Sequence, residues 1–311
     1  MPSCRPCGET DVEGQETLEP ILEVKHLTHT YGVGTPFERS AVEDMSFEVE
    51  RGEFLGIIGH TGSGKSTLVQ LLNGLTRPEA GRVLLDGQDI WQDPKQISKV
   101  RFRVGLVMQY PEYQLFEETV RADIAFGPRN MQLSGEEIAE RVDEAAAFAG
   151  VDPSLLDKSP FDLSGGQKRR VAIAGIMAMR PEVLVLDEPA AGLDPQGRRD
   201  IFGGIRAYNR ETGSTVVIVS HSMEDMAQYC DDVAVMAHAR LLMTGTRDEV
   251  FARADELEAV GLDIPVITKL SALLRQGGMP LDPGLYTLEA AEAALAQVFG
   301  LPADREGGKK R

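Results

Sequence analysis

The sequence predicts an α/β fold built around a largely parallel sheet, and two features of the chain support this class. Short apolar, β-rich runs recur along it, at residues 104–107, 183–186, 215–219 and 233–236. Helical patterns separate these runs. Continuous apolar strands that alternate with helices are typical of a parallel sheet buried on both faces.

We expect residues 110–165 to form a helical insert in this core. Ser134 and Glu137 have the spacing of a capping box, which begins a helix. An apolar stripe follows them at helical spacing, at Ile138, Val142 and Ala145. After residue 255 the pattern is irregular and contains one short predicted helix over 288–298.

The part of the chain before the first apolar run predicts strands. Residues 21–31 alternate apolar and polar side chains, as a half-buried strand does. A loop rich in Gly and Pro follows at 32–36. Residues 46–59 predict two strands joined through Arg51 and Gly52.

The domain boundaries follow from these patterns. Residues 1–20 are polar and acidic and predict a mobile tail, in which Cys4 and Cys7 have no second pair at metal-binding spacing. Residues 21–254 form the predicted main domain, and residues 255–311 a small C-terminal extension.

Composition excludes several classes of protein. The 311 residues are 42% hydrophobic and 26% charged, which are ordinary globular values. A net charge of −17 disfavours nucleic acid as a partner and makes direct adsorption to an anionic membrane surface unfavourable. With three cysteines, no secretory signal and no bilayer-spanning apolar run, we expect a soluble intracellular protein, and any association with a membrane would run through a protein partner.

The most specific motif is a phosphate-binding loop between a predicted strand at 54–58 and a predicted helix at 67–75. Its glycines let backbone N–H groups surround phosphate oxygens at a helix N-terminus. The lysine supplies a charge to the β- and γ-phosphates, and the serine hydroxyl can bind Mg²⁺. The predicted ATP-binding residues here are Gly59, His60, Thr61, Gly62, Ser63, Gly64, Lys65, Ser66 and Thr67.

Two acidic residues end the buried run at 183–186. Asp187 would lie at the carboxyl edge of the sheet, where ligands bind in such folds, and can bind Mg²⁺. Glu188 can act as the general base on an attacking water.

Between these motifs the chain resembles the ATP-binding-cassette (ABC) ATPases, whose LSGGQ signature stands at 163–167. Other motifs of that family follow in its order: the Q-loop glutamine at Gln109, the D-loop aspartate at Asp194 and the switch histidine at His221. The resemblance implies catalytic roles for Glu188, His221 and Gln109 and a Mg²⁺ site at Ser66, Gln109 and Asp187. The implied signature residues, which act on the ATP of a partner cassette, are Ser164, Gly165, Gly166 and Gln167.

Longer runs resemble one branch of the family, the ATPase subunits of energy-coupling-factor (ECF) transporters, and the chain is most similar to the second of the two paired ATPase subunits. They lie at 34–38, 58–65, 109–116 and 167–175. The resemblance implies an N-terminal antiparallel β subdomain, a helical signature subdomain and the C-terminal extension. It further implies ATP-driven uptake of a vitamin or transition-metal ion at the cytoplasmic face of the membrane. The implied partners are a second ABC ATPase, a transmembrane coupling scaffold and a substrate-binding membrane subunit.

The resemblance leaves two local roles open. An aromatic side chain stacks on adenine in the family; Tyr31 matches that position, and Phe37 in the following loop is the alternative. Three acids after the Q-loop glutamine, Glu112, Glu117 and Glu118, either meet arginines of a membrane subunit or are solvated.

Other functions compete with this assignment. The ATPase of an ordinary binding-protein-dependent importer shares every catalytic motif and differs only in its partners. ABC proteins of DNA repair insert long coiled coils before the signature, and no heptads occur here. Translation-associated ABC proteins carry two cassettes, and a non-catalytic regulator would be expected to lack a residue such as Lys65 or Glu188. The transported solute, homodimer or heterodimer assembly, and the role of residues 255–311 stay open.

Overall fold

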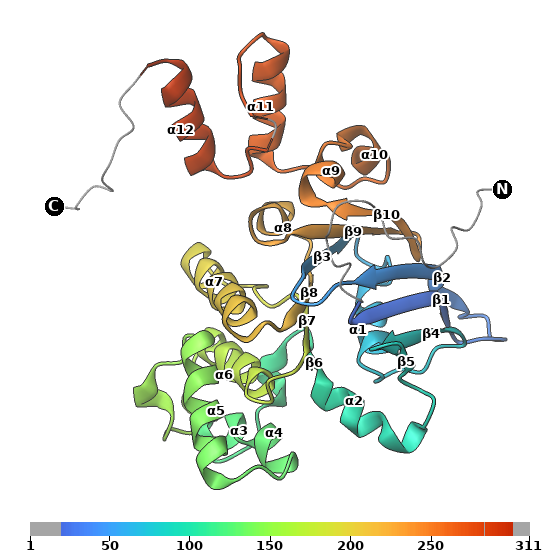
Figure 1. The fold of residues 1–311 in the computed structure, drawn as a ribbon, viewed down its shortest axis with the longest axis vertical. Coiled ribbons are helices and arrows are strands. Elements are labelled where there is room, and N and C mark those ends of the chain that lie inside the picture. Colours follow the sequence, from blue (N-terminus) through green and yellow to red (C-terminus); the bar gives the residue numbers. More distant parts are fainter. Residues whose placement is uncertain (1–19, 283, 301–311) are drawn as a thin grey trace, which may run out of the picture.

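The computed structural model describes residues 20–282 and 284–300 (Figure 1). Of the predicted acidic tail only Pro20 is described, and Cys4 and Cys7 lie outside the described residues.

A six-stranded sheet organises the molecule, in the order β10-β9-β3-β8-β7-β6. All neighbouring pairs are parallel except the hairpin of β9 and β10. The predicted α/β class is therefore confirmed. The strands are β3 (Phe54–Gly59), β6 (Val104–Val107), β7 (Val183–Asp187), β8 (Thr215–Val219), β9 (Asp232–Ala237) and β10 (Arg240–Thr246).

Alternate side chains of the parallel strands enter two separate hydrophobic cores. Along β8, Val216 and Ile218 face one core, and Val217 and Val219 face the other. This period of two follows from strand geometry, and it explains why these runs are apolar at every position.

The core that contains Val217 and Val219 lies against an antiparallel sheet of order β2-β1-β4-β5. Its strands are β1 (Leu22–Tyr31), β2 (Arg39–Val49), β4 (Ala80–Leu85) and β5 (Gln88–Asp89). Helix α1 (Lys65–Leu72) contributes Leu68 and Leu71 to the same core. This helix begins two residues before the predicted range and ends three residues before its end, because the chain turns at Asn73 and at Gly74, whose φ is +69°.

Helices cover the opposite face of the parallel sheet (Figure 1). The elements on this side include α6 (Gly165–Met177), α7 (Pro195–Thr212) and α8 (Met223–Tyr229). The predicted insert contains α3 (Val120–Ile124), α4 (Phe126–Asn130) and α5 (Gly135–Phe148), and α6 packs against α3 and α5. Ser134 and Glu137 form the predicted capping box at the start of α5. Helix α2 (Ile97–Arg103) leads into β6.

The C-terminal residues form α9 (Arg247–Phe251), α10 (Ala254–Ala259), α11 (Val266–Gln276) and α12 (Leu288–Val298). Their inner side chains join the core of the helical side through Leu257, Leu262, Ile264 and Tyr286. Figure 1 shows α11 and α12 projecting beyond the sheets. No helix among the described residues is both long and apolar enough to cross a bilayer.

Candidate functional site

The parallel strands bring the predicted motifs to one edge of the sheet. The phosphate loop follows β3, Gln109 follows β6, and Asp187 and Glu188 lie at the end of β7. His221 follows β8, the next strand. Because parallel strands share one carboxyl edge, residues far apart in the sequence meet there.

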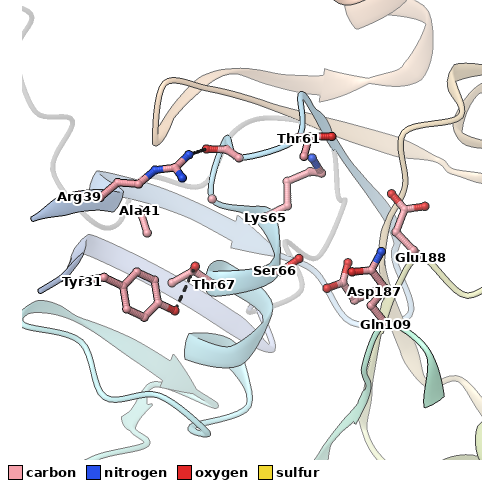
Figure 2. A pocket seen from close by; sticks show the side chains of 12 residues that line it. Tyr31, Arg39, Ala41, Thr61, Lys65, Ser66, Thr67, Gln109, Asp187 and Glu188 are labelled. Atoms are coloured by element: carbon pink, nitrogen blue, oxygen red, sulfur yellow. Dashed lines mark hydrogen bonds between the residues drawn. The ribbon is translucent and has the colours of Figure 1, made fainter. Parts of the chain in front are cut away.

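A pocket of about 260 Å³ opens at this edge (Figure 2). Ten of the predicted site residues line it: Tyr31, Thr61, Gly62, Gly64, Lys65, Ser66, Thr67, Gln109, Asp187 and Glu188. Two further lining residues, Arg39 and Ala41, were not predicted from the sequence. Gly59, His60 and Ser63 belong to the same loop but do not line the pocket.

The loop needs glycine at two of its positions for steric reasons. Gly62 and Gly64 have φ of +82° and +102°, in the left-handed region that disfavours other residues. A Cβ on Gly64 would also lie 1.8 Å from the carbonyl oxygen of Ala41. Strand β2 therefore abuts the loop where α1 begins.

Lys65 is held close to the loop backbone. Its Nζ donates to the carbonyl oxygens of Gly59, at 2.6 Å, and His60, at 2.8 Å. Burial lowers the pKa of Lys65, and the nearby charges of Glu188 and Asp187 oppose that shift. The ammonium group therefore lies between the loop and the two carboxylates, where a phosphate group would fit.

Asp187, Ser66 and Gln109 provide oxygen donors suited to Mg²⁺. Burial raises the pKa of Asp187, while its hydrogen bond with Ser66 and the charge of Lys65 oppose the rise. Carboxylate, hydroxyl and amide oxygens are hard ligands that fit this ion, which usually also keeps waters and substrate phosphates. The residues present therefore fit the implied cofactor.

Glu188 and His221 interact directly. His221 Nδ1 lies 2.9 Å from Glu188 Oε1. The Glu188 side chain is only 12% exposed, whereas that of His221 is 71% exposed. Glu188 has φ of +53°, an unusual value for a non-glycine residue, and its N–H donates to the carbonyl of Val219 on β8 at 2.9 Å. The backbone of β8 thus holds the carboxylate at the pocket.

The two aromatic candidates for adenine differ in position. Tyr31 lines the pocket, and its hydroxyl lies 3.3 Å from Thr67 Oγ1 (Figure 2). Phe37 is not among the lining residues and is 85% exposed in the turn between β1 and β2.

Arg39 enters the pocket through strand pairing, which local sequence does not reveal. It lies opposite Tyr31 in the β1–β2 ladder. Its Nη2 donates to the carbonyl oxygen of Gly62 at 3.1 Å, as Figure 2 shows. Among the described residues, Arg39 has no carboxylate partner within ion-pair distance. A cation is thus available between the adenine position and the phosphate loop.

The signature residues lie apart from this pocket within the same chain. Ser164 caps α6, and Ser164 and Gln167 form a capping box. Ser164 and Gly165 are exposed, and neither they nor Gly166 and Gln167 are among the lining residues of the pocket. Asp194 caps α7 by accepting a hydrogen bond from the Gly197 N–H at 2.7 Å.

Two of the three acids after Gln109 have partners within the chain. Glu112 pairs with Arg169 at 3.1 Å, and Glu117 pairs with Arg129 at 2.6 Å. The proposal that both meet arginines of a membrane subunit is therefore not supported, because their charges are already compensated. Glu118 is exposed. The same segment exposes aromatic side chains instead, at Tyr110, Tyr113, Phe116 and Phe126.

Comparison with known proteins agrees with this geometry. The family model described as "ABC transporter" matches residues 42–191. The "Energy-coupling factor transporter ATP-binding protein EcfA2" of Symbiobacterium thermophilum is 53% identical over 284 residues, which cover 91% of this chain and 97% of the relative. The protein of the same name from Clostridium tetani is 50% identical over 279 residues, which cover 89% of this chain and 97% of that relative.

This chain belongs to the ECF transporter ATP-binding proteins, a branch of the ABC family.

Solved structures support the fold of this ECF ATPase. The structure of cbiO1 from Clostridium perfringens, described as part of the ABC transporter complex cbiONQ, has a TM-score of 0.69 and 40% identity. The match covers 82% of this chain and 99% of the cbiO1 chain. The cassette MJ0796, solved as a dimer in a post-hydrolysis state with ADP and Pi, has a TM-score of 0.66 and 27% identity. That match covers 73% of this chain and 98% of the MJ0796 chain. The predicted ABC ATPase fold is therefore confirmed.

Proposed function

We propose a working cycle for this ATPase subunit of an ECF importer, in which ATP hydrolysis in a pair of cassettes drives uptake of a vitamin or a transition-metal ion. The observation that carries the proposal is the pocket that joins Lys65, Asp187, Glu188 and Gln109. The relatives that are about 50% identical over nearly their whole length support the ECF branch over an ordinary importer.

The pocket residues divide the binding of ATP among them. Tyr31 stacks on adenine, and the loop N–H groups with Lys65 bind the phosphates. Ser66, Gln109 and Asp187 hold Mg²⁺, which neutralises charge on the phosphate oxygens when bound. Each of these side chains already faces the pocket, so binding requires little reorganisation.

Glu188 acts as the general base. Its carboxylate accepts a proton from the water that attacks the γ-phosphate, while His221 orients this carboxylate and contacts the phosphate. The short link between Glu188 and His221 and the buried position of Glu188 support this division.

The cycle needs a second cassette. The exposed helix start at Ser164 and Gly165 offers N–H groups outside this chain's own pocket, so it suits the γ-phosphate of ATP bound to a partner. Asp194, at the start of α7, lies at this interface. We propose that the partner is a related ABC ATPase, giving a heterodimer, and that closure of the dimer alternates with hydrolysis.

The membrane partners are a transmembrane coupling scaffold and a small substrate-binding subunit. We place the ATPase on the cytoplasmic face of the membrane, held by the scaffold. The exposed aromatic residues after Gln109, including Phe116 and Phe126, provide an apolar surface for this contact.

An affinity purification from detergent-solubilised membranes tests the assembly. The tagged chain should recover a second cassette, a multi-span scaffold and a small membrane protein that identifies the solute class. Phe116→Asp should lose the membrane proteins, whereas Phe37→Asp, a change at another exposed aromatic residue, should keep them. Recovery of a permease pair with a binding protein would assign the chain to an ordinary importer, and recovery of no membrane protein would contradict transport.

A further inference from the structure

One residue of the phosphate loop contacts the C-terminal part of the chain, 200 residues away in sequence. The ring Nε2 of His60 forms a hydrogen bond with the carbonyl oxygen of Val260. The contact is close, since a Cβ on Gly261 would lie 3.2 Å from His60 Cε1. A carbonyl only accepts, so Nε2 of His60 carries the proton.

The C-terminal side of this contact is firmly anchored. The turn after α10 is closed by hydrogen bonds from the N–H of Gly261 to the carbonyl of Glu258 and from the N–H of Leu262 to that of Leu257, both at 2.8 Å. Leu257 is fully buried, and Leu262 is nearly so. The carbonyl of Val260 is therefore held in place by the main core.

The other side of the contact leads to the phosphate-binding lysine. The backbone carbonyl of His60 accepts a hydrogen bond from Lys65 Nζ at 2.8 Å and one from the N–H of Ser63 at 3.1 Å. Through its ring and its carbonyl, His60 thus connects the turn at 260–262 to the ammonium group of Lys65.

We propose that His60 is a positioning residue that couples nucleotide binding to the C-terminal segment 257–262. The ring contact with Val260 holds the loop backbone at His60, and the carbonyl of His60 in turn helps to hold the ammonium of Lys65 where a phosphate group would meet it. By linkage, a turn held by His60 favours the loop conformation that binds nucleotide, and bound nucleotide stabilises the turn in return. The proposal rests on the ATP site described under Proposed function.

Three variants at His60 separate hydrogen bonding from ring packing. Gln keeps an N–H donor, Phe keeps a flat ring without a donor, and Ala removes both. MgADP affinity of the full chain should fall about three- to tenfold in His60→Ala and His60→Phe, the loss of one hydrogen bond, and stay near the wild-type value in His60→Gln.

Hydrogen exchange provides a readout that packing alone would not move. Addition of MgADP should slow exchange of the peptide containing 257–262 in the wild type and in His60→Gln, and leave it unchanged in His60→Ala and His60→Phe. Because Ala and Phe are compared with Gln at the same position, a general loss of folding would appear in all three variants. An MgADP effect on 257–262 that persists in His60→Ala or His60→Phe would overturn the coupling.

Two glycines offer a matched pair on the C-terminal side. Gly261→Ala should weaken MgADP binding, since the new Cβ presses on the His60 ring. Gly278→Ala imposes similar backbone strain, because φ is +90° at Gly278 and +70° at Gly261. No atom lies within 4 Å of a Cβ at position 278, so this variant should bind MgADP normally. Equal affinities and equal exchange in all variants would overturn the proposal, whereas a wild-type chain that fails to bind MgADP would contradict the ATP site itself.

Discussion

Glu188 occupies a backbone conformation that few carboxylate residues adopt. Its φ of +53° costs on the order of 1 kcal/mol, and the structure keeps it through the hydrogen bond from its N–H to Val219. Such strain is common where a side chain must be aimed at a reacting group. Here it directs the carboxylate toward His221 and the pocket rather than along the sheet.

Replacement of Glu188 should separate binding from hydrolysis. Glu188→Gln keeps the shape and one oxygen but removes the base, so the hydrolysis rate should fall at least ~100-fold while ATP still binds. Single-turnover hydrolysis and equilibrium binding of labelled ATP measure the two quantities. Lys65→Ala provides the contrast, because it should lose affinity as well. Turnover near the wild-type rate in Glu188→Gln would rule out this base.

Arg39 adds a cation that standard motif analysis does not identify. Its guanidinium lies on the phosphate loop at Gly62 and faces the same pocket as Tyr31. We therefore expect it to contact the nucleotide between the adenine and the terminal phosphate. Arg39→Gln should lower ATP affinity about tenfold, the loss of one charge-assisted hydrogen bond.

The salt dependence of binding provides a second measure of Arg39. The affinity of Arg39→Gln should vary less steeply with ionic strength than that of the wild type. Arg82→Gln is a suitable control, because it makes the same change of charge at an exposed position of β4. Equal affinities for Arg39→Gln and Arg82→Gln would show that Arg39 does not contact ATP.

At the scale of elements, a buried ion pair joins the segment after Gln109 to helix α6. The Arg169 side chain is 5% exposed and that of Glu112 17% exposed. Arg169 also donates to the carbonyl of Ala191, in the loop that leads to Asp194. One guanidinium therefore holds together the Q-loop segment, the signature helix and the D-loop.

Loss of Arg169 should be costly for stability. Arg169→Met leaves the carboxylate of Glu112 without its partner, and a broken buried pair typically costs about 3–5 kcal/mol. Urea unfolding measures the change. Arg121→Met breaks the exposed pair with Asp143 and should cost no more than about 1 kcal/mol. Similar losses for both variants would mean that burial of Arg169 adds nothing.

At the scale of the whole molecule, acidic residues gather at the edge of the parallel sheet opposite the ATP pocket. Glu53 precedes β3, and Asp231 and Asp232 lie at the start of β9. Burial, helped by repulsion from these neighbours and from Glu50, raises the pKa of Glu53 from 4.5 to about 7. Some of the acidic residues behind the net charge of −17 thus lie where burial and neighbouring acids oppose ionisation.

The raised pKa of Glu53 predicts a pH-dependent stability. An unfolded chain ionises Glu53 near pH 4.5, whereas the folded chain resists ionisation until about pH 7, so stability falls as pH rises through this window. Glu53→Gln should therefore stabilise the protein by about 1–2 kcal/mol at pH 8 and have little effect at pH 4. Thermal unfolding at both pH values measures this difference. Glu48 is exposed and lines the same acidic hollow as Glu53, Asp231 and Asp232. Glu48→Gln therefore controls for general relief of charge, and equal effects of the two variants at pH 8 would contradict the role of Glu53.

Much of this molecule could be predicted because its chemistry is encoded locally. The spacing of Gly59 to Ser66 forms a phosphate loop wherever a strand precedes it and a helix follows, since glycine backbone geometry and helix N–H groups suffice. Asp187 and Glu188 could be placed at the same edge because a parallel sheet aligns the carboxyl ends of its strands. The α/β class followed from apolar runs that alternate with helices.

Contacts between segments that are distant in sequence depend instead on the tertiary structure. The position of Arg39 opposite Tyr31 depends on the β1–β2 register, and that of Ala41 on how β2 abuts the loop at Gly64. The pairing of Glu112 with Arg169, and of the His60 ring with Val260, depends on how helices and turns pack on the sheet. The sequence alone determined the fold class and the chemistry of each motif, because these depend on neighbours along the chain. The partners of single side chains depend on neighbours in space, which packing of the complete core selects.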